Sequence, residues 1–136
     1  MKTRLLYILA LLCVAGWINP VNAQNQRIID SLMNELNGDV ADTTLLNTYL
    51  TLSSEFVFNS PDTALYFTDQ ALDLAESLQD TLSIAECYNY FGIVGTIQGK
   101  YVTGIENFQK ALEWYEKGED LEGASILINN IGVVYG

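Results

Sequence analysis

The side chains of this 136-residue chain that could do chemistry are mostly carboxylates, because the sequence holds 17 Asp and Glu, two Cys and no His. Paired carboxylates can act as general acid and base, or can hold a metal ion. Here they are spread along the chain, as in Glu113, Glu116 and Glu119, and none has the spacing of a calcium-binding loop. This spacing is typical of a solvated helix face, so we expect no catalytic residue, cofactor or metal site among them.

The residue inventory also excludes several other classes of function. Without His, and with two Cys, the chain cannot assemble a His-based catalytic triad or a four-cysteine cluster. It has only six Lys and Arg and a formal net charge of −11, whereas nucleic-acid binding needs clustered basic side chains. The sequence favours a binding or scaffolding module over an enzyme, and we expect no nucleic-acid partner.

The first residues have the pattern of a targeting segment. Lys2 and Arg4 precede an apolar run of fourteen residues from Leu5 to Ile18. A transmembrane helix needs about 20 apolar residues, whereas the core of a secretory signal takes about 7 to 15. Small or modest residues then reach Ala23, so we predict a signal peptide over residues 1–23; the alternative is an uncleaved anchor. Residues 24–136 are thus expected on the periplasmic or other extracytoplasmic side of a bacterial membrane.

The predicted exported part is more acidic than the whole chain. It holds 17 acidic and 4 basic side chains, a net charge of −13, and one Cys, Cys87. A single Cys cannot form an internal disulfide, so packing alone must hold this part together. Cys87 lies in a helical apolar pattern, and we expect a buried, unreactive thiol.

The exported part is predicted to be all-helical, because its apolar residues recur at spacings of three and four. A leading helix and linker occupy residues 24–41, with the helix ending at Asn37 and Gly38. Asp42 or Thr43 is expected to cap the second helix, and Ser60 with Pro61 to start the third. The predicted helices cover residues 28–36, 42–59, 61–78, 81–98 and 102–117, and a last one from about 120 that is still running at 136.

An offset of 40 residues aligns the chain with itself. Gly92 falls on Gly132, Ala111 on Ala71 and Gly104 on Ala64. Helices that cross closely need small residues at the crossing and large apolar residues one turn away, which explains why small positions recur in phase. The pattern predicts three units, at residues 42–80, 81–119 and a truncated third from 120.

The stretch from Ala85 to Gly118 resembles the tetratricopeptide repeat. The resemblance rests on an aromatic and a large–small pair in the first helix, a glycine turn followed by an aromatic, and a second helix with Ala at the crossing. The residues that match are Tyr88, Phe91, Gly92, Gly99, Tyr101, Ile105, Phe108, Ala111 and Leu112. The resemblance implies a right-handed solenoid of antiparallel helix hairpins, in which Ala64, Ala71 and Gly132 also pack between repeats.

Several residues depart from that family pattern. Gly95 stands where a large residue is usual, and Gly104 replaces Ala. In the first hairpin, Ser53 fits only with a shorter turn, and Thr68 stands where an aromatic is usual. The step of 40 also exceeds the family's common step of about 34, and resembles longer variants in bacterial signalling proteins.

The resemblance also suggests where a ligand would bind. In this family the first helices of the repeats line a concave groove that can hold an extended peptide. Asn is suited to this because its amide both donates and accepts hydrogen bonds. The alternative is that these Asn residues join neighbouring repeats or face solvent. The groove candidates are Asn89, Tyr90, Ile93, Ile97, Asn129, Asn130 and Val133.

The sequence stops at Gly136, inside the first helix of the third hairpin. We expect either a fragment of a longer protein or a partner that covers this edge. By resemblance, such an exported module is the sensor part of a bacterial signalling protein, a histidine kinase or a membrane-anchored transcription regulator. The alternative is a free-standing periplasmic adaptor or glycan-associated protein, since the 8 Tyr and 2 Trp could stack on sugars.

Overall fold

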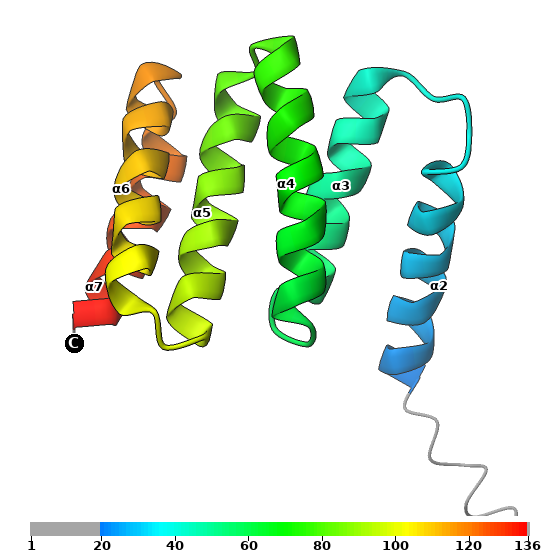
Figure 1. The fold of residues 1–136 in the computed structure, drawn as a ribbon, viewed down its shortest axis with the longest axis horizontal. Helices are drawn as coiled ribbons and strands as arrows, with labels where there is room; N and C mark the ends of the chain where they lie inside the picture. The colour runs from blue at the N-terminus through cyan, green and yellow to red at the C-terminus, as the bar shows by residue number, and fades with distance from the viewer. Residues whose placement is uncertain (1–19, 136) are drawn as a thin grey trace, which may run out of the picture.

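The computed structural model describes residues 20–135, with side chains for residues 25–135. All the regular structure in this range is helical, as predicted from the apolar spacing. The predicted signal segment up to Ile18 lies outside the described residues, and the first described helix includes the predicted cleavage point after Ala23. The helices, drawn in Figure 1, are α2 (Pro20–Glu35), α3 (Asp42–Phe56), α4 (Pro61–Leu78), α5 (Thr81–Ile97), α6 (Tyr101–Lys117) and α7 (Leu121–Tyr135).

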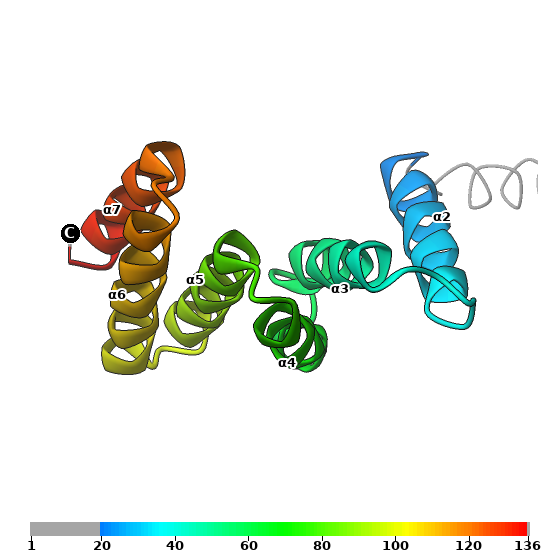
Figure 2. The ribbon, with the colours of Figure 1, turned by 90° about the horizontal axis from the view of Figure 1, so that it is seen from above.

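Consecutive helices run in opposite directions and follow one another in a row (Figures 1 and 2). Each packs against the helix before it and the helix after it, and α3 also contacts α5. The leading helix α2 is joined to α3 by a hydrogen bond of 2.8 Å from Thr48 Oγ1 to Glu35 Oε2. Packing between sequence neighbours is therefore what holds the described part together.

The start of α3 and the turn after it differ from the sequence-based prediction. The N-cap residue is Ala41, which has no capping side chain, so neither Asp42 nor Thr43 caps this helix. The helix ends at Phe56 and not near Asn59, and in the turn that follows the Phe56 carbonyl accepts the backbone N–H groups of Asn59 and Ser60. Ser60 does occupy the N-cap of α4, but its hydroxyl lies 2.7 Å from Thr63 Oγ1 and makes no capping bond to the backbone.

The turns before α5 and α7 have the same geometry, 40 residues apart. Gln79 and Glu119 adopt left-handed φ angles of 56° and 58°. The next residue in each turn is an aspartate that accepts a backbone N–H three residues on: Asp80 from Ser83 at 3.1 Å, and Asp120 from Gly123 at 3.0 Å. The repeat found in the sequence is therefore also a repeat of backbone conformation.

The crossing of α5 and α6 depends on glycine. A Cβ atom built on Gly92 would lie 2.3 Å from the ring of Phe108, so only glycine leaves room for that ring. One turn further, a Cβ on Gly95 would lie 3.1 Å from the Cα of Gly104. The two glycines that depart from the family pattern thus allow the backbones to approach closely. Tyr101, expected to pack at the start of α6, is 56% exposed.

The crossing of α3 and α4 is filled by hydroxyl groups. Ser53 and Thr68 are both 0% exposed, and their hydroxyl oxygens lie 3.0 Å apart. Each hydroxyl also pairs with a carbonyl one turn earlier in its own helix, Thr68 with Ala64 at 2.8 Å and Ser53 with Tyr49 at 2.9 Å. Two short hydroxyl side chains in contact thus stand where the second hairpin has glycine and an aromatic ring.

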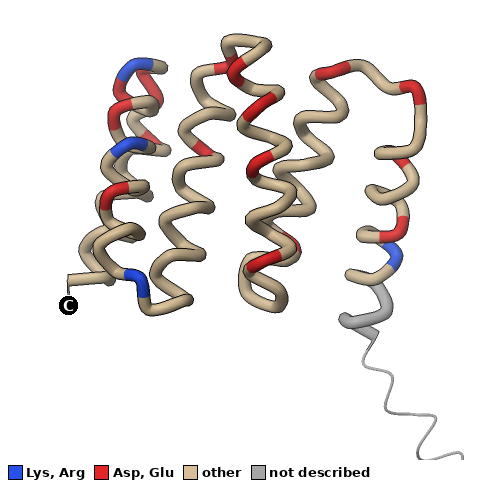
Figure 3. Tube along the Cα trace, in the orientation of Figure 1, with Lys and Arg blue, Asp and Glu red and all other residues tan. Residues whose placement is uncertain are grey.

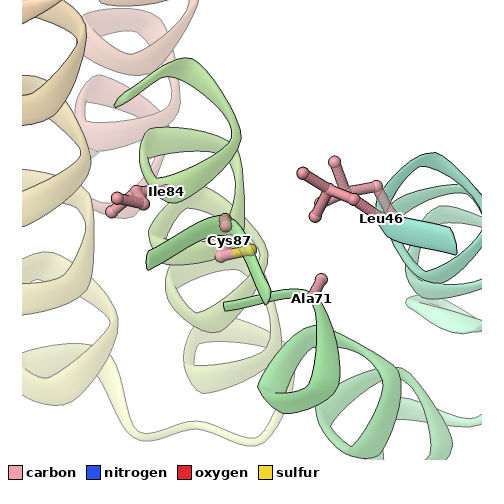
Figure 4. Close-up of a cluster of buried hydrophobic side chains, with 6 residues drawn as sticks. Leu46, Ala71, Ile84 and Cys87 are labelled. Carbon is pink, nitrogen blue, oxygen red and sulfur yellow. The ribbon is translucent and has the colours of Figure 1, made fainter. Parts of the chain in front are cut away.

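The main core cluster is built from three consecutive helices (Figure 4). Leu46 comes from α3, Ala71 from α4, and Ile84 and Cys87 from α5. All four are buried, and Cys87 is 0% exposed. The prediction that Cys87 is buried is therefore confirmed.

We expect the Cys87 thiol to resist alkylation in the folded protein. Burial, and to a smaller extent nearby carboxylates with Glu86 first among them, raise its pKa to about 12. Because the thiolate is the reactive form, iodoacetamide at about pH 8 should leave Cys87 unmodified in the native chain and label it after urea is added. Mass spectrometry of the Cys87 peptide measures this, and rapid native labelling would contradict the packing.

Candidate ligand pocket between α5 and α7

An apolar pocket of about 310 Å³ opens between the last turns of α5 and α7. The buried ring of Phe108, 2% exposed, forms part of its wall, while Phe58 and Val133 are 76% and 81% exposed. Its volume is at the lower end of the range for ligand pockets, roughly 300 to 1,000 Å³. The lining residues are Phe58 from the α3–α4 turn, Ile93, Thr96 and Ile97 from α5, Phe108 from α6, and Asn130, Val133 and Val134 from α7.

No lining side chain carries a charge, although the chain as a whole is strongly acidic. Figure 3 shows acidic residues along α4 and around the α6–α7 turn. The last turns of α5 and α7 contain no acidic residue. The pocket therefore suits an uncharged, apolar group.

Two polar groups give the pocket directional chemistry. The Asn130 side-chain N–H donates to Asn89 Oδ1 at 3.3 Å, and Thr96 Oγ1 donates to the Gly92 carbonyl at 3.0 Å. An Asn amide has two N–H groups and a carbonyl oxygen, so the bond to Asn89 occupies only part of the capacity of Asn130. The remaining amide atoms can pair with a peptide backbone at the pocket.

The pocket gathers four of the seven predicted groove residues: Ile93, Ile97, Asn130 and Val133. Asn89 lies next to the pocket and accepts the hydrogen bond from Asn130. This bond joins the first helices of two neighbouring repeats, as the alternative interpretation of the Asn residues expected.

Two predicted groove residues lie outside the pocket. Tyr90 is packed against the buried clusters between α3, α4 and α5, and its hydroxyl donates to Glu86 Oε1 at 3.2 Å. Asn129 is exposed and does not line this pocket.

Three lining residues, Phe58, Thr96 and Val134, were not predicted from the sequence, and Phe108 was predicted only to pack between repeats. The helical period does place Thr96 beside Ile93 and Ile97, so Thr96 could have been found. Phe58 lies in a turn, where no period applies, and could not. No Tyr or Trp lines the pocket, so the rings considered for sugar stacking are not at this site.

The Glu86 carboxyl, on α5 and outside the pocket, is partly buried. Burial raises its pKa above the usual value, the hydrogen bond from Tyr90 lowers it, and the nearby Asp80 carboxylate raises it. Burial also raises the pKa of the Tyr90 hydroxyl, and the Glu86 carboxylate raises it further. Both groups are therefore kept protonated to higher pH than in water.

We expect Glu86→Gln to stabilise the fold at neutral pH. Because the folded state raises the pKa of this carboxyl, its contribution to stability is full below the usual glutamate pKa and is lost as pH rises through the raised value. Glutamine keeps an oxygen for Tyr90 and never ionises. Urea unfolding of both proteins should show the variant gaining on the wild type between about pH 4 and pH 7. Glu113→Gln, at an exposed position on α6, is the control.

Comparisons with known proteins give no relative: no family model, curated protein or solved structure matches the chain. Among the described residues, no group of three or more Cys, Asp or Glu is placed to hold a metal ion. No helix in the described range is long and apolar enough to cross a membrane.

Proposed function

We propose that this chain is a tetratricopeptide-like repeat module that binds an extended peptide, or an exposed segment of another protein, at the α5–α7 pocket. The observation that carries the proposal is the pocket itself, where the exposed apolar side chains of Phe58, Ile97 and Val133 surround a cavity beside the Asn130 amide. Exposed large apolar side chains that converge on one cavity are typical of an interaction site.

The repeat architecture supports this proposal. The starts of α4 and α6 are 40 residues apart, as are those of α5 and α7. The left-handed residues Gln79 and Glu119 and the capping residues Asp80 and Asp120 recur at the same step. In a right-handed solenoid of such hairpins, α3, α5 and α7 are the first helices, and these helices and their turns supply every lining residue except Phe108.

The chemistry of the pocket limits the ligand. An aliphatic or aromatic side chain fits a cavity of about 310 Å³ with uncharged walls, and the Asn130 amide can fix the ligand backbone next to it. An acidic side chain would lose its hydration there without gaining a cationic partner. We therefore expect Leu or Phe to be preferred over Asp at the central ligand position.

A titration with acetylated tripeptide amides tests this function. The Ala-Leu-Ala and Ala-Phe-Ala peptides should shift the NMR signals of Ile93, Ile97 and Val133, and Ala-Asp-Ala should not. Shifts confined to other helices, or equal shifts with all three peptides, would refute the proposal.

A matched pair of variants tests whether binding depends on the pocket or on the surface in general. Val133→Gln places a polar group at the pocket mouth and should weaken binding of Ala-Leu-Ala by about tenfold. Val102→Gln makes the same change on α6, at a side chain that is 73% exposed and does not line the α5–α7 pocket, and should leave binding unchanged. Equal affinities of the two variants would show that the pocket is not the site.

Export and a role in bacterial signalling belong to the same proposal. Export is supported by Lys2, Arg4 and the apolar run that follows, which precede Ala23. Amino-terminal sequencing of the protein recovered from the periplasm should give Gln24 as the first residue. Recovery of an intact Met1 from the cytoplasm would contradict export while leaving the binding proposal to its own test.

A further inference from the structure

One face of α7, which carries three large apolar side chains, is covered by no other described part of the chain. Leu121, Ile128 and Tyr135 on this face are 84%, 58% and 71% exposed, and Gly132 lies between them on the helix surface. Together with the exposed Ser125, these residues form what we call the open α7 face. Scattered apolar side chains on a surface are ordinary, but five residues along one side of a helix form a continuous strip.

The equivalent face of α5 is covered by α6. At the offset of 40 residues, Ile128 corresponds to Tyr88, which packs against the cluster containing Phe108 and Ala111. Ser125, which is exposed, corresponds to Ala85, which is 0% exposed. The open α7 face is therefore the counterpart of a surface that elsewhere in this molecule accepts a helix.

Glycine gives the clearest comparison between the two faces. A Cβ on Gly92 would meet the Phe108 ring at 2.3 Å, whereas a Cβ on Gly132 would meet nothing within 4 Å. Glycine inside a helix costs about 1 kcal/mol relative to alanine, and Gly92 offsets this cost by admitting the ring. In the described part of the chain, Gly132 has the same cost and no ring to admit.

The opposite face of α7 shows that α5 and α7 are equivalent in their packing as well as in their sequence. Cys87 and Val94 on α5 are 0% and 1% exposed because α4 packs on them. Their counterparts Leu127 and Val134 pack on α6, with Leu127 at 0% exposed. The faces turned to the preceding helix agree, and only the faces turned to a following helix differ.

The charges at one end of the face indicate what the covering helix carries. Beside the first turn of α5, Glu76 and Gln79 line a pocket with Trp114 and Lys117 from the last turn of α6. The Lys117 ammonium lies 4.3 Å from the centre of the Trp114 ring. The counterparts of Glu76 and Gln79 are Glu116 and Glu119, both exposed and both acidic, so this edge suits a cation still better.

We propose that the open α7 face docks an amphipathic α-helix of the α6 type, running antiparallel to α7. This helix places an aromatic ring against Gly132, with a small residue four positions before the ring and another three positions after it, as Gly104 and Ala111 flank Phe108. Its last turn presents an aromatic residue to Leu121 and a Lys or Arg to Glu116 and Glu119. The inference concerns a second surface and does not depend on the α5–α7 pocket.

A second copy of this chain does not meet these requirements through its own α7. That helix contains no basic side chain to meet Glu116 and Glu119. The chain has a formal net charge of −11, so two copies repel one another. We therefore assign the face to a different helix, which carries positive charge at its carboxyl end.

The probe for this proposal is the α6 sequence itself, as an acetylated and amidated peptide of residues 100–118. Added to the full chain, it should shift the backbone NMR signals of Ile128, Gly132 and Tyr135 and become helical by circular dichroism. Replacing the peptide residue that corresponds to Phe108 with alanine should weaken binding by about tenfold or more. A second variant peptide, with the residue corresponding to Lys117 replaced by glutamate, should also bind more weakly.

Two α7 variants separate docking from folding. Gly132→Leu fills the space meant for the ring and should abolish peptide binding, while thermal unfolding stays at or above the wild-type temperature because nothing lies within 4 Å. Asn129→Leu places the same side chain on α7 but outside the open α7 face. Asn129 is the counterpart of Asn89, whose side chain pairs with Asn130 on α7. This variant should keep full peptide binding.

Three results would overturn the proposal. The first is that the Gly132→Leu variant binds the peptide as tightly as the wild type does, and that the NMR signals that shift belong to α5. This would mean that the peptide only displaces the chain's own α6. The second is the absence of binding at millimolar peptide. The third is a dimer of the unliganded chain that Gly132→Leu dissociates, which would assign the face to a second copy.

Discussion

Gly92→Ala is expected to lower the free energy of unfolding by about 2 to 3 kcal/mol, although alanine is the better helix former. The added Cβ would lie 2.3 Å from the ring of the buried Phe108, so either the ring or the helices must shift. The ring can move only into the α5–α7 pocket that it lines, which breaks its packing in the crossing; otherwise α5 and α6 separate, which also opens the contact between Gly95 and Gly104. Urea unfolding followed by circular dichroism measures the change.

Gly132→Ala is the matched control for this prediction. It makes the same substitution at the counterpart position on α7, where nothing lies within 4 Å. With no clash, the gain in helix propensity remains, and stability should rise by up to about 1 kcal/mol. Equal effects of the two substitutions would mean that the α5–α6 crossing has room for a methyl group beside the Phe108 ring.

Phe108→Ala is expected to cost about 3 to 5 kcal/mol, the largest effect of any single substitution considered. Its ring fills the crossing opposite Gly92, joins α6 to α7 through Leu127, and forms part of the α5–α7 pocket. Domains are stable by only about 5 to 15 kcal/mol, so this loss is a large part of the total. Chemical unfolding should show a midpoint at much lower urea.

Phe58→Ala is the control for Phe108→Ala. It removes an aromatic ring from the same pocket without removing a buried ring from the core. Phe58 lines the same pocket but is 76% exposed, so its removal should change stability by no more than about 0.5 kcal/mol while weakening ligand binding. Comparable destabilisation by both variants would contradict the assignment of Phe108 to the core.

The helices and their period could be predicted from the sequence because both depend on local spacing. Pro61 and Leu78 bound α4 as predicted, and α5 and α6 differ from the prediction by one residue. Small residues such as Ala71 and Ala111 were assigned to the crossings and are 0% exposed. An amphipathic period specifies which side of a helix faces inward, and that was sufficient for these features.

Features that depend on a particular pair of side chains could not be predicted in this way. Thr68 departs from the family pattern, and only the position of Ser53 across the crossing shows that the two hydroxyls replace a ring. Tyr90 has the same period as Ile93, yet its hydroxyl pairs with Glu86 and leaves it outside the pocket. The helical period shows which side of the helix a residue faces. It does not show which side chains the residue contacts on that side, or how deeply it is buried.

The candidate site shows the same division. Ile93, Ile97, Asn130 and Val133 share a direction on two helices related by the repeat, and the structure brings them to one pocket. Phe58 completes that pocket from a turn, where the backbone path and not a helical period sets its position.

Photo-crosslinking tests the proposed binding function most directly. The acetylated Ala-Leu-Ala amide, with photo-leucine in place of leucine, is irradiated with the full chain, and the labelled residues are mapped by mass spectrometry. We expect label on the segments that contain Phe58, Ile97 and Val133, and its loss when unmodified Ala-Leu-Ala competes. Label spread over all helices, or label that excess competitor does not reduce, would contradict a peptide site between α5 and α7.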